Sequence, residues 1–277
     1  MTLISSLISK KGIAVGTDSM LTAVNKHGSH TYIEWEKSKI VPIPKLRSCI
    51  AYWGFAGTLK EIPKDDNKPQ WQWQTHSWLN SQSVNPRFSS LDDFAKALRD
   101  GLDSELNKLG MSKQGIGIHI TGIEEIGGYR IPELFLISNY KNPPSYSEIG
   151  DLEYSRHTYH AIAEVDPSPD HGKIEYRLKV NKFLNEVGFI IYNNGDPVMF
   201  NPFAKSFFDS FSEAQKRGLA KEITSVRETI PIVRFPIESV SSIQRNFYKL
   251  DKKLVGGRVH DLSIDDEGTM FSTSGDY

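Results

Sequence analysis

The order of strand-like and helical segments is the feature of this chain that most constrains its fold. Short apolar runs typical of β-strands occur in three groups, and pairs of segments with helical periodicity separate the groups. Short turns between successive strands favour antiparallel pairing, and helices between groups of strands cover the faces of sheets. The order therefore predicts an α+β fold, a four-layer αββα sandwich with two antiparallel sheets between layers of helices.

Turn residues separate the runs of the first group. The segment from Lys10 to Gly12 is typical of a hairpin turn between the first two runs. Pro42 favours a sheet edge or a strand end for the third run, because proline cannot donate to a strand ladder. The predicted strands span residues 2–8, 12–17, 39–43, 48–53, 115–121, 132–138, 187–192, 258–264 and 269–272. Residues 160–165 and 174–180 are further candidate strands, and residues 141–151 are expected to form a loop.

Helical periodicity is clearest between residues 91 and 110. Ser89 and Ser90 precede two acidic residues, which is typical of a helix N-terminus. One apolar face then continues to Gly110 and is formed by Phe94, Leu98, Leu102 and Leu106. Further helices are predicted over residues 71–79, 202–217 and 238–254. In the first of these, Trp71, Trp73 and Trp78 are expected to pack in the core or at a subunit contact rather than to bind a ligand.

Composition excludes several functional classes. The 277 residues include 33 Lys and Arg and 34 Asp and Glu, a balance that argues against a nucleic-acid-binding protein. Cys49 is the only cysteine, which excludes an intramolecular disulfide and a cysteine-rich zinc site. The sequence shows no signal peptide and no apolar run near the ~20 residues of a membrane helix. We expect a cytoplasmic protein with no nucleic-acid or membrane partner.

Thr2 is the first candidate for chemistry. Removal of Met1 would leave Thr2 with a hydroxyl nucleophile and a free amine on one residue. An α-amine has an unperturbed pKa of about 7.7–8.0, which suits a general base near neutral pH. Many intracellular proteins begin with Met-Thr, so this feature alone is not specific.

Three further features follow Thr2 in a defined order. Asp18-Ser19-Met20-Leu21-Thr22 ends the second run, Lys39 begins the third, and Gly54-Phe55-Ala56-Gly57 ends the fourth. This order resembles the catalytic β-subunits of the proteasome and the related peptidase subunits of bacterial ATP-dependent proteases, which belong to the N-terminal nucleophile (Ntn) hydrolase superfamily. Residues 255–259, Val-Gly-Gly-Arg-Val, resemble the terminal Gly-Gly strand of that family. The resemblance covers the first sixty residues well, the region from residue 187 loosely, and the middle poorly.

The resemblance implies a threonine-type endopeptidase and a role for each matched residue. Thr2 would supply the nucleophilic Oγ and, through its amine, the base. The ammonium of Lys39 would favour the developing alkoxide, and Asp18 would orient that lysine. The backbone N–H of Gly57, at the start of a helix, would donate to the oxyanion.

The same resemblance implies a substrate and partners. Thr22 would lie on the strand that pairs with an extended peptide, while Leu21 and Phe55 would line an apolar, chymotrypsin-like pocket. The substrate would be a peptide or an unfolded protein. The family also implies a homo-oligomeric ring, allows an ATP-dependent unfoldase as a partner, and requires neither a cofactor nor a metal.

The chain departs from the family pattern at two positions. Asn194 stands in the turn where the family has a serine; it can hydrogen-bond an amine but cannot relay a proton. Asp251 matches a family aspartate, but one extra residue follows it and Val255 replaces the family's serine. These departures keep two alternatives open, a catalytically inactive scaffold or binding protein with this fold and a small-molecule Ntn amidohydrolase.

The chain shows no internal repeat and no linker. We therefore expect one proteasome-like domain over residues 1–277, with insertions relative to the family at 23–38, 61–90 and 141–185. His157 and His160 are spaced like metal ligands on a helix, but a packed or solvated pair is favoured because Glu153 is their only acidic neighbour in the sequence.

Overall fold

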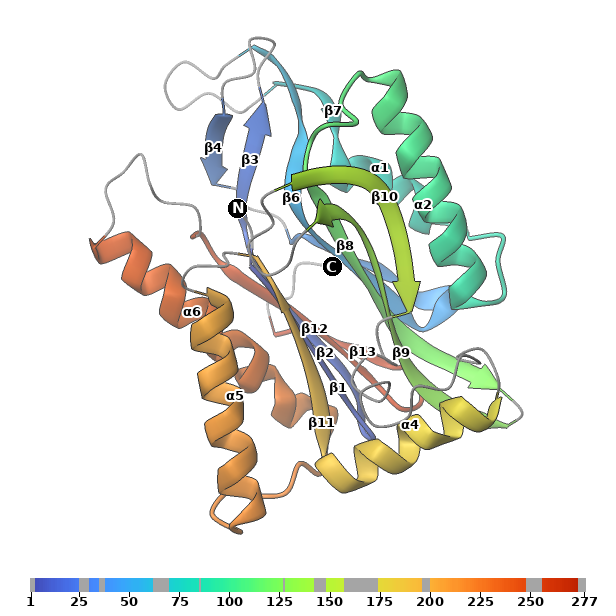
Figure 1. Ribbon diagram of the computed structural model, residues 1–277, viewed down its shortest axis with the longest axis vertical. Coiled ribbons are helices and arrows are strands. Elements are labelled where there is room, and N and C mark those ends of the chain that lie inside the picture. The colour runs from blue at the N-terminus through green and yellow to red at the C-terminus, as the bar shows by residue number, and fades with distance from the viewer. Residues whose placement is uncertain are drawn as a thin grey trace.

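Two β-sheets form the centre of the computed structural model (Figure 1). The structure describes residues 3–24, 30–34, 38–61, 70–84, 86–126, 128–141, 148–156, 174–195, 200–247 and 256–273. The first sheet has the strand order β11-β1-β2-β12-β13, with the bounds Phe189–Asn194, Ile4–Ser9, Gly12–Asp18, Val259–Asp265 and Met270–Phe271. Its strand pairs are all antiparallel.

The second sheet has eight strands in the order β10-β9-β8-β6-β3-β4, and β5 and β7 also pair with β6. Their bounds in that order are Glu148–Arg156, Tyr129–Lys141, Ile116–Ile126, Ser48–Glu61, Met20–Val24 and His30–Glu34, with β5 at Ile40–Ile43 and β7 at Gln70–Gln74. The pair β3–β6 is parallel, and the other pairs are antiparallel. The coarse prediction of two largely antiparallel sheets with helices is therefore confirmed.

The predicted hairpin joins β1 and β2. Ile8 lies opposite Ile13, and Ser9 opposite Gly12, so the turn falls at Lys10 and Lys11. Gly12 has φ of 125°, and a Cβ there would lie 2.0 Å from the carbonyl oxygen of Ile264. Only glycine fits this position, because β12 approaches its backbone closely. Every residue of β1 and β2 is buried.

Three hydrophobic clusters hold the sheets and helices together. One cluster joins the facing sides of the two sheets and includes Ile8 and Val15 from the first sheet and Ala51 and Trp53 from the second. Another packs α1 (Thr75–Ser83) and α2 (Leu91–Lys108) against the second sheet. The third packs α5 (Phe200–Lys216) and α6 (Ile230–Phe247) against the first. The two helix pairs therefore cover opposite sides of the paired sheets (Figure 1).

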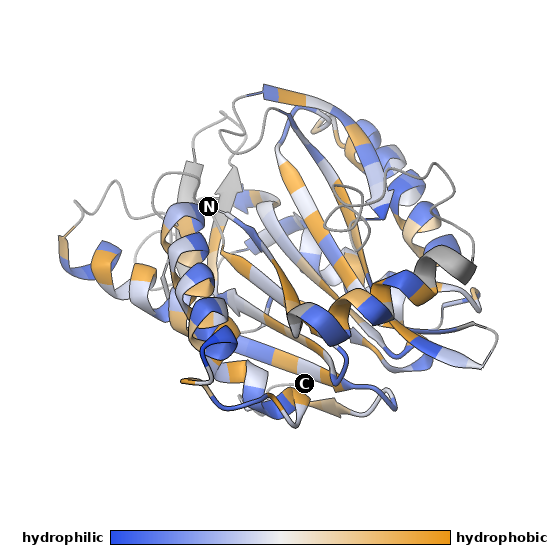
Figure 2. Ribbon diagram, turned by 60° about the horizontal axis from the view of Figure 1, so that its bottom comes forward, coloured by the Kyte–Doolittle hydropathy of each residue, from blue (hydrophilic) through white to orange (hydrophobic). Residues whose placement is uncertain are grey.

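The predicted periodicity of α2 is confirmed. Ser90 is its N-cap and accepts a hydrogen bond from the backbone N–H of Asp93 at 3.2 Å. The four expected apolar residues are buried against the second sheet. The coloured part of α4 (Ile174–Val187), at the front of Figure 2, carries both polar and apolar residues, as expected of a helix with one face toward the core.

Several predicted elements are wrong. Residues 174–180 belong to the helix α4, although their apolar residues alternate like those of a strand; Val180 and Leu184, one helical turn apart, are buried together. Residues 148–151, predicted as a loop, begin the edge strand β10. Its polar sequence hid it, because β10 is largely exposed and, within the described ranges, pairs with β9 alone. The candidate strand at 160–165 lies outside the described residues.

Two predicted helices have other bounds. Residues 70–74 form the strand β7, and the helix α1 begins only at Thr75. Helix α6 begins at Ile230 instead of residue 238 and contains Pro236. The packing prediction for the tryptophans is confirmed for Trp73, which stacks on Phe55 with ring centroids 5.8 Å apart.

Candidate active site

Asp18 and Lys39 form an ion pair that is fully enclosed. Asp18 is the last residue of β2 in the first sheet, and Lys39 directly precedes β5 in the second. The Lys39 Nζ lies 3.1 Å from Asp18 Oδ1, and both side chains are 0% exposed. Nζ also donates to the backbone carbonyl oxygen of Met20, the first residue of β3. The predicted meeting of this aspartate and this lysine is therefore observed, at a point where the two sheets join.

The Asp18 carboxylate also holds two backbone segments. Its Oδ1 accepts a hydrogen bond from the N–H of Leu3 at 2.9 Å, and its Oδ2 accepts one from Gly256 at 3.2 Å. The N–H of Asp18 donates to the carbonyl oxygen of Leu3 at 3.3 Å. One aspartate thus joins the beginning of β1, the Gly-Gly segment before β12, and the lysine. Thr2 and Asp251 lie outside the described residues.

Burial changes the acidity of Lys39. Desolvation lowers its pKa from 10.5 to about 8, although the charge of Asp18 and its hydrogen bond oppose this shift. At neutral pH the side chain is still mainly an ammonium ion. Between pH 8 and 10.5 only the unfolded chain keeps this proton, so the free energy of unfolding contributed by Lys39 rises with pH in that window. A lysine with this pKa changes its charge near the pH at which an α-amine titrates.

A second group of polar side chains, buried at Ser6 and His119 and half-buried at Asn194, links the two sheets. Ser6 Oγ lies 2.8 Å from His119 Nδ1, and His119 Nε2 lies 2.6 Å from Asn194 Oδ1. His119 is on β8 of the second sheet, whereas the other two residues are on β1 and β11 of the first. Burial lowers the pKa of His119 to about 4, so its ring is neutral at pH 7. Trp53 packs edge-on against this ring, with the two ring centroids 5.4 Å apart.

Ser6 and His119 were not predicted as site residues, although their patterns contained a signal. Ile4 and Ile8 face the cluster between the sheets, so strand alternation places Ser6 on that same apolar face. Ile118 and Ile120 face the helices α1 and α2, which turns His119 toward the other sheet. A buried polar side chain on such a face needs a hydrogen-bonding partner. The partner of Ser6 and the partner of His119 could therefore have been sought on the facing sheet.

Gly57 does not stand at the start of a helix, so that expectation is wrong. It lies inside β6, opposite Gln74 of β7, with φ of 145°. A Cβ there would lie 2.3 Å from the carbonyl oxygen of Trp73, so the glycine permits a close approach of β7. The Gly57 N–H therefore has no helix terminus to strengthen it as a donor.

The residues expected to form the substrate pocket are separated in the structure. Leu21 packs with Ala56 and Leu59, whereas Phe55 belongs to the cluster under α1 and α2. The backbones of Thr22 and Phe55 are register partners in the parallel pair β3–β6.

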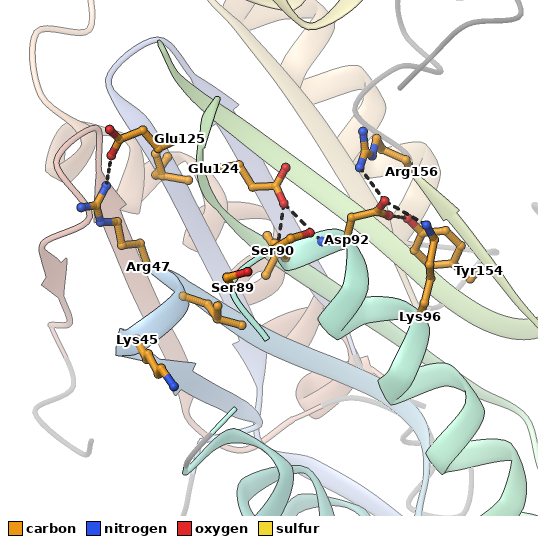
Figure 3. A pocket seen from close by; sticks show the side chains of 13 residues that line it. Lys45, Arg47, Ser89, Ser90, Asp92, Lys96, Glu124, Glu125, Tyr154 and Arg156 are labelled. Atoms are coloured by element: carbon orange, nitrogen blue, oxygen red, sulfur yellow. Dashed lines mark hydrogen bonds and ion pairs between the residues drawn. The ribbon is translucent and has the colours of Figure 1, made fainter. Parts of the chain in front are cut away.

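A cavity of about 550 Å³ lies elsewhere, at the start of α2 (Figure 3). Its charged side chains already have partners, some of them other side chains and some of them backbone groups. Asp92 pairs with Lys96 at 3.0 Å and with Arg156 at 3.2 Å, and the Glu124 carboxylate accepts from the first backbone N–H groups of α2. We assign no ligand to this cavity. Among the described residues, no cluster of histidine, cysteine or acidic side chains is suited to a metal ion, and no helix is long and apolar enough to cross a membrane.

Comparisons with known proteins identify no family for this chain. No family model matches it, and no curated protein matches it. Among solved structures, the chain is similar to an Anbu (Gly-1) mutant from Hyphomicrobium sp. strain MC1, with a TM-score of 0.49 and 11% sequence identity. The alignment covers 98% of this chain and 85% of that one. At this TM-score the likeness decides nothing about activity, and the functional argument rests on the residues.

Proposed function

We propose that this chain is a proteasome-like N-terminal threonine hydrolase that cleaves peptides or unfolded proteins after Met1 is removed. The observation that carries the proposal is the environment of Asp18, whose Oδ1 binds both the Lys39 ammonium and the N–H of Leu3. Leu3 is joined to Thr2 by one peptide bond, and consecutive Cα atoms are about 3.8 Å apart. This arrangement favours a Thr2 side chain within reach of the buried cation.

The proposed reaction uses the two functional groups of Thr2. The neutral α-amine takes the proton of Oγ, directly or through a water, and Oγ attacks the substrate carbonyl carbon. The resulting ammonium returns the proton to the leaving amine as the C–N bond breaks, which leaves an ester on Thr2. Water, deprotonated by the same amine, then hydrolyses that ester. Lys39 lowers the cost of negative charge on Oγ throughout.

Stabilisation of the oxyanion is assigned to a backbone donor on β6. Gly57 stays our candidate, but as a strand N–H without support from a helix dipole. Leu21, Thr22 and Phe55 stay candidates for substrate contact, but β3 already pairs with β4 and with β6, so the extended peptide is not placed along β3. Asn194 is proposed to bind the α-amine, and Asp251 to lie close to it.

We further propose that the clusters described above represent the four-layer αββα sandwich of Ntn hydrolases, built as one domain and assembled into a homo-oligomeric ring. A ring that encloses its active sites would keep a peptidase of broad specificity away from other cell proteins. An ATP-dependent unfoldase would be a fitting partner for such a ring.

The proposal predicts a bell-shaped dependence of kcat/KM on pH. The active form needs a neutral α-amine and a charged Lys39. A neighbouring ammonium lowers the pKa of the amine below its ordinary value of about 7.7–8.0. The acidic limb of the profile is therefore expected at a lower pH than the alkaline limb. The alkaline limb is expected near pH 8, where Lys39 loses its proton. The profile is measured as the hydrolysis of fluorogenic peptides from about pH 5 to about pH 10. This range includes the pKa values expected for the amine and for Lys39.

Two lysine substitutions make this test specific. A guanidinium stays protonated, so Lys39→Arg should move the alkaline limb above about pH 10 while lowering the maximal rate. Lys45→Arg is the control, because Lys45 binds the carbonyl oxygen of Pro86 and not the site. An alkaline limb that stays near pH 8 in Lys39→Arg would show that Lys39 is not the titrating group.

A further inference from the structure

The direction of the backbone hydrogen bonds in β1 follows from one contact at its beginning. The N–H of Asp18 donates to the carbonyl oxygen of Leu3 at 3.3 Å, which makes these two residues a hydrogen-bonded pair of β1 and β2. Hydrogen-bonded and non-hydrogen-bonded pairs alternate along antiparallel strands. The next residue, Ile4, therefore directs its N–H and carbonyl group away from β2 and toward β11, where its register partner is Asn194.

The same alternation decides which backbone groups of β11 are turned outward. Because Asn194 bonds toward β1, the N–H and carbonyl groups of Phe189, Ile191 and Asn193 point to the other side. Within the described ranges no strand pairs with β11 on that side, and Figure 1 shows β11 as the outermost strand of its sheet. Side chains hold the strand in place, since Phe189 packs under α5 and α6 and Ile190 packs between the sheets. One side of β11 thus presents an ordered row of backbone donors and acceptors.

The strand β11 lacks the features that protect an edge of the other sheet. The edge strand β10 carries charged side chains at Glu148, Asp151, Glu153 and Arg156, and its pairing with β9 shifts register. Charges and irregular pairing keep an edge strand from adding another strand. The sequence of β11, Phe-Ile-Ile-Tyr-Asn-Asn, has no charge and no proline, and its register with β1 has no shift. Its edge is therefore suited to accept a further strand.

The length of this edge and the place where it ends indicate the occupant. The six residues of β11 span about 20 Å, which suits a short extended peptide. An edge of this length and one sheet thickness, about 10 Å, covers roughly 200 Å² on each partner, well below the ~800 Å² per partner of a stable dimer. A second copy of the chain is therefore not the favoured occupant.

The Asn194 end of the edge lies beside the beginning of β1. Asn194 is opposite Ile4, the residue that follows the Leu3 bound by Asp18. A strand added to β11 would lie two strand spacings, about 10 Å, from β1. About three extended residues span that distance, so one polypeptide could occupy the edge and reach this end of β1.

Resting on the proposed function, we infer that the outer edge of β11 binds an extended, uncharged segment of the polypeptide substrate as an additional strand of the first sheet. Backbone hydrogen bonds hold such a segment with little dependence on its sequence, which suits a hydrolase of unfolded proteins. The bound segment lies to one side of the bond that is cleaved. The edge is thus a substrate-binding strand and takes no part in the chemical step.

Proline at position 191 tests the edge without disturbing the pairing with β1. Ile191→Pro removes an outward N–H and places the proline ring on that side, a position that edge strands tolerate. Ile191→Val is the matched control, because it trims the side chain and keeps the N–H. Both are compared in the Thr2→Ala protein, so that the probe is not cleaved. The melting temperature shows whether each variant is folded.

The measurement is the fluorescence anisotropy of a labelled peptide. The probe has six residues, alternating valine and serine, between terminal lysines, to match the length of β11. We expect Ile191→Pro to weaken binding at least about tenfold and Ile191→Val to bind within about twofold of the parent. A probe that is N-methylated at every peptide nitrogen should not bind. If Ile191→Pro does not fold, Asn193→Pro, with Asn193→Ser as its control, removes the next outward N–H and should weaken binding likewise.

The outcomes separate this inference from the proposed function. Equal binding by the parent and a folded proline variant, or binding of the N-methylated probe, would overturn the role of β11 alone. A parent that sediments as a dimer, does not bind the probe and becomes monomeric in Ile191→Pro would show that a second copy takes the edge, which also overturns the inference. Loss of binding in Ile191→Pro together with a wild-type protein that retains Met1 and hydrolyses no peptide would support the β11 edge and overturn the proposed function.

Discussion

Thr2→Ala is expected to lower peptide hydrolysis by at least about 10³-fold, to the background of the assay. The substitution removes the hydroxyl that forms the ester and leaves the α-amine and the ion pair in place. Alanine is also small, so removal of Met1 should proceed as before. The measurement is kcat/KM for a fluorogenic peptide, with the melting temperature recorded to show that the fold is intact.

Thr2→Ser is the matched variant for this prediction. It keeps a hydroxyl and an α-amine on the same residue and should retain hydrolysis within about one order of magnitude of wild type. Turnover by Thr2→Ala equal to that of wild type would remove Thr2 from the mechanism. Absence of turnover in wild type, Thr2→Ala and Thr2→Ser alike would favour the inactive scaffold. Turnover of small acyl-amides but not of peptides would instead favour the amidohydrolase alternative.

Asp18→Asn is expected to lower the free energy of unfolding by about 3–5 kcal/mol and to abolish hydrolysis. Both members of the ion pair are 0% exposed, so the substitution leaves the Lys39 ammonium without a counter-charge in the interior. The pKa of Lys39, already lowered by burial, should then fall further, and the cation that the reaction needs would be lost at neutral pH. Urea denaturation and kcat/KM measure the two effects.

A double substitution separates stability from chemistry. Asp18→Asn with Lys39→Met removes both charges and should recover much of the lost stability, because no unpaired charge is left buried. It should recover no hydrolysis. Lys205→Met with Asp209→Asn removes an exposed helical pair and should change stability by only about 0.5 kcal/mol or less. If the double variant at Asp18 and Lys39 hydrolyses peptides like wild type, the ion pair has no part in catalysis.

The contact between Asp18 and Lys39 was expected from the resemblance to the proteasome β-subunits, whereas local pattern placed only the strands that carry the two residues. The apolar runs of β2 and β5 are short and bounded by turns, and this fixed where their ends lie along the chain. The hairpin β1–β2 and the helix α2 were predictable for the same reason, since their patterns are local. The edge strand β10 and the helix α4 were not, because exposure hides the pattern of one and the first residues of the other alternate like a strand.

Contacts between the two sheets depend on how the sheets pack, and local pattern does not contain that information. Ser6 and His119 are 113 positions apart, and only the packing of the two sheets brings them together. The strand position of Gly57 was missed for a related reason. The strand β7, which pairs with Gly57, follows after an intervening stretch of the chain. The residues from Gly54 to Gly57 contain no pattern that predicts this pairing.

The account depends most directly on whether Thr2 becomes the first residue and reacts. Intact-mass spectrometry of the purified protein, before and after treatment with a β-lactone that acylates terminal threonines, tests both points in one measurement. The account predicts a chain that lacks the Met1 residue and that gains one lactone equivalent, located by fragmentation on Thr2. A chain that retains Met1 throughout, or that gains no adduct, would contradict it.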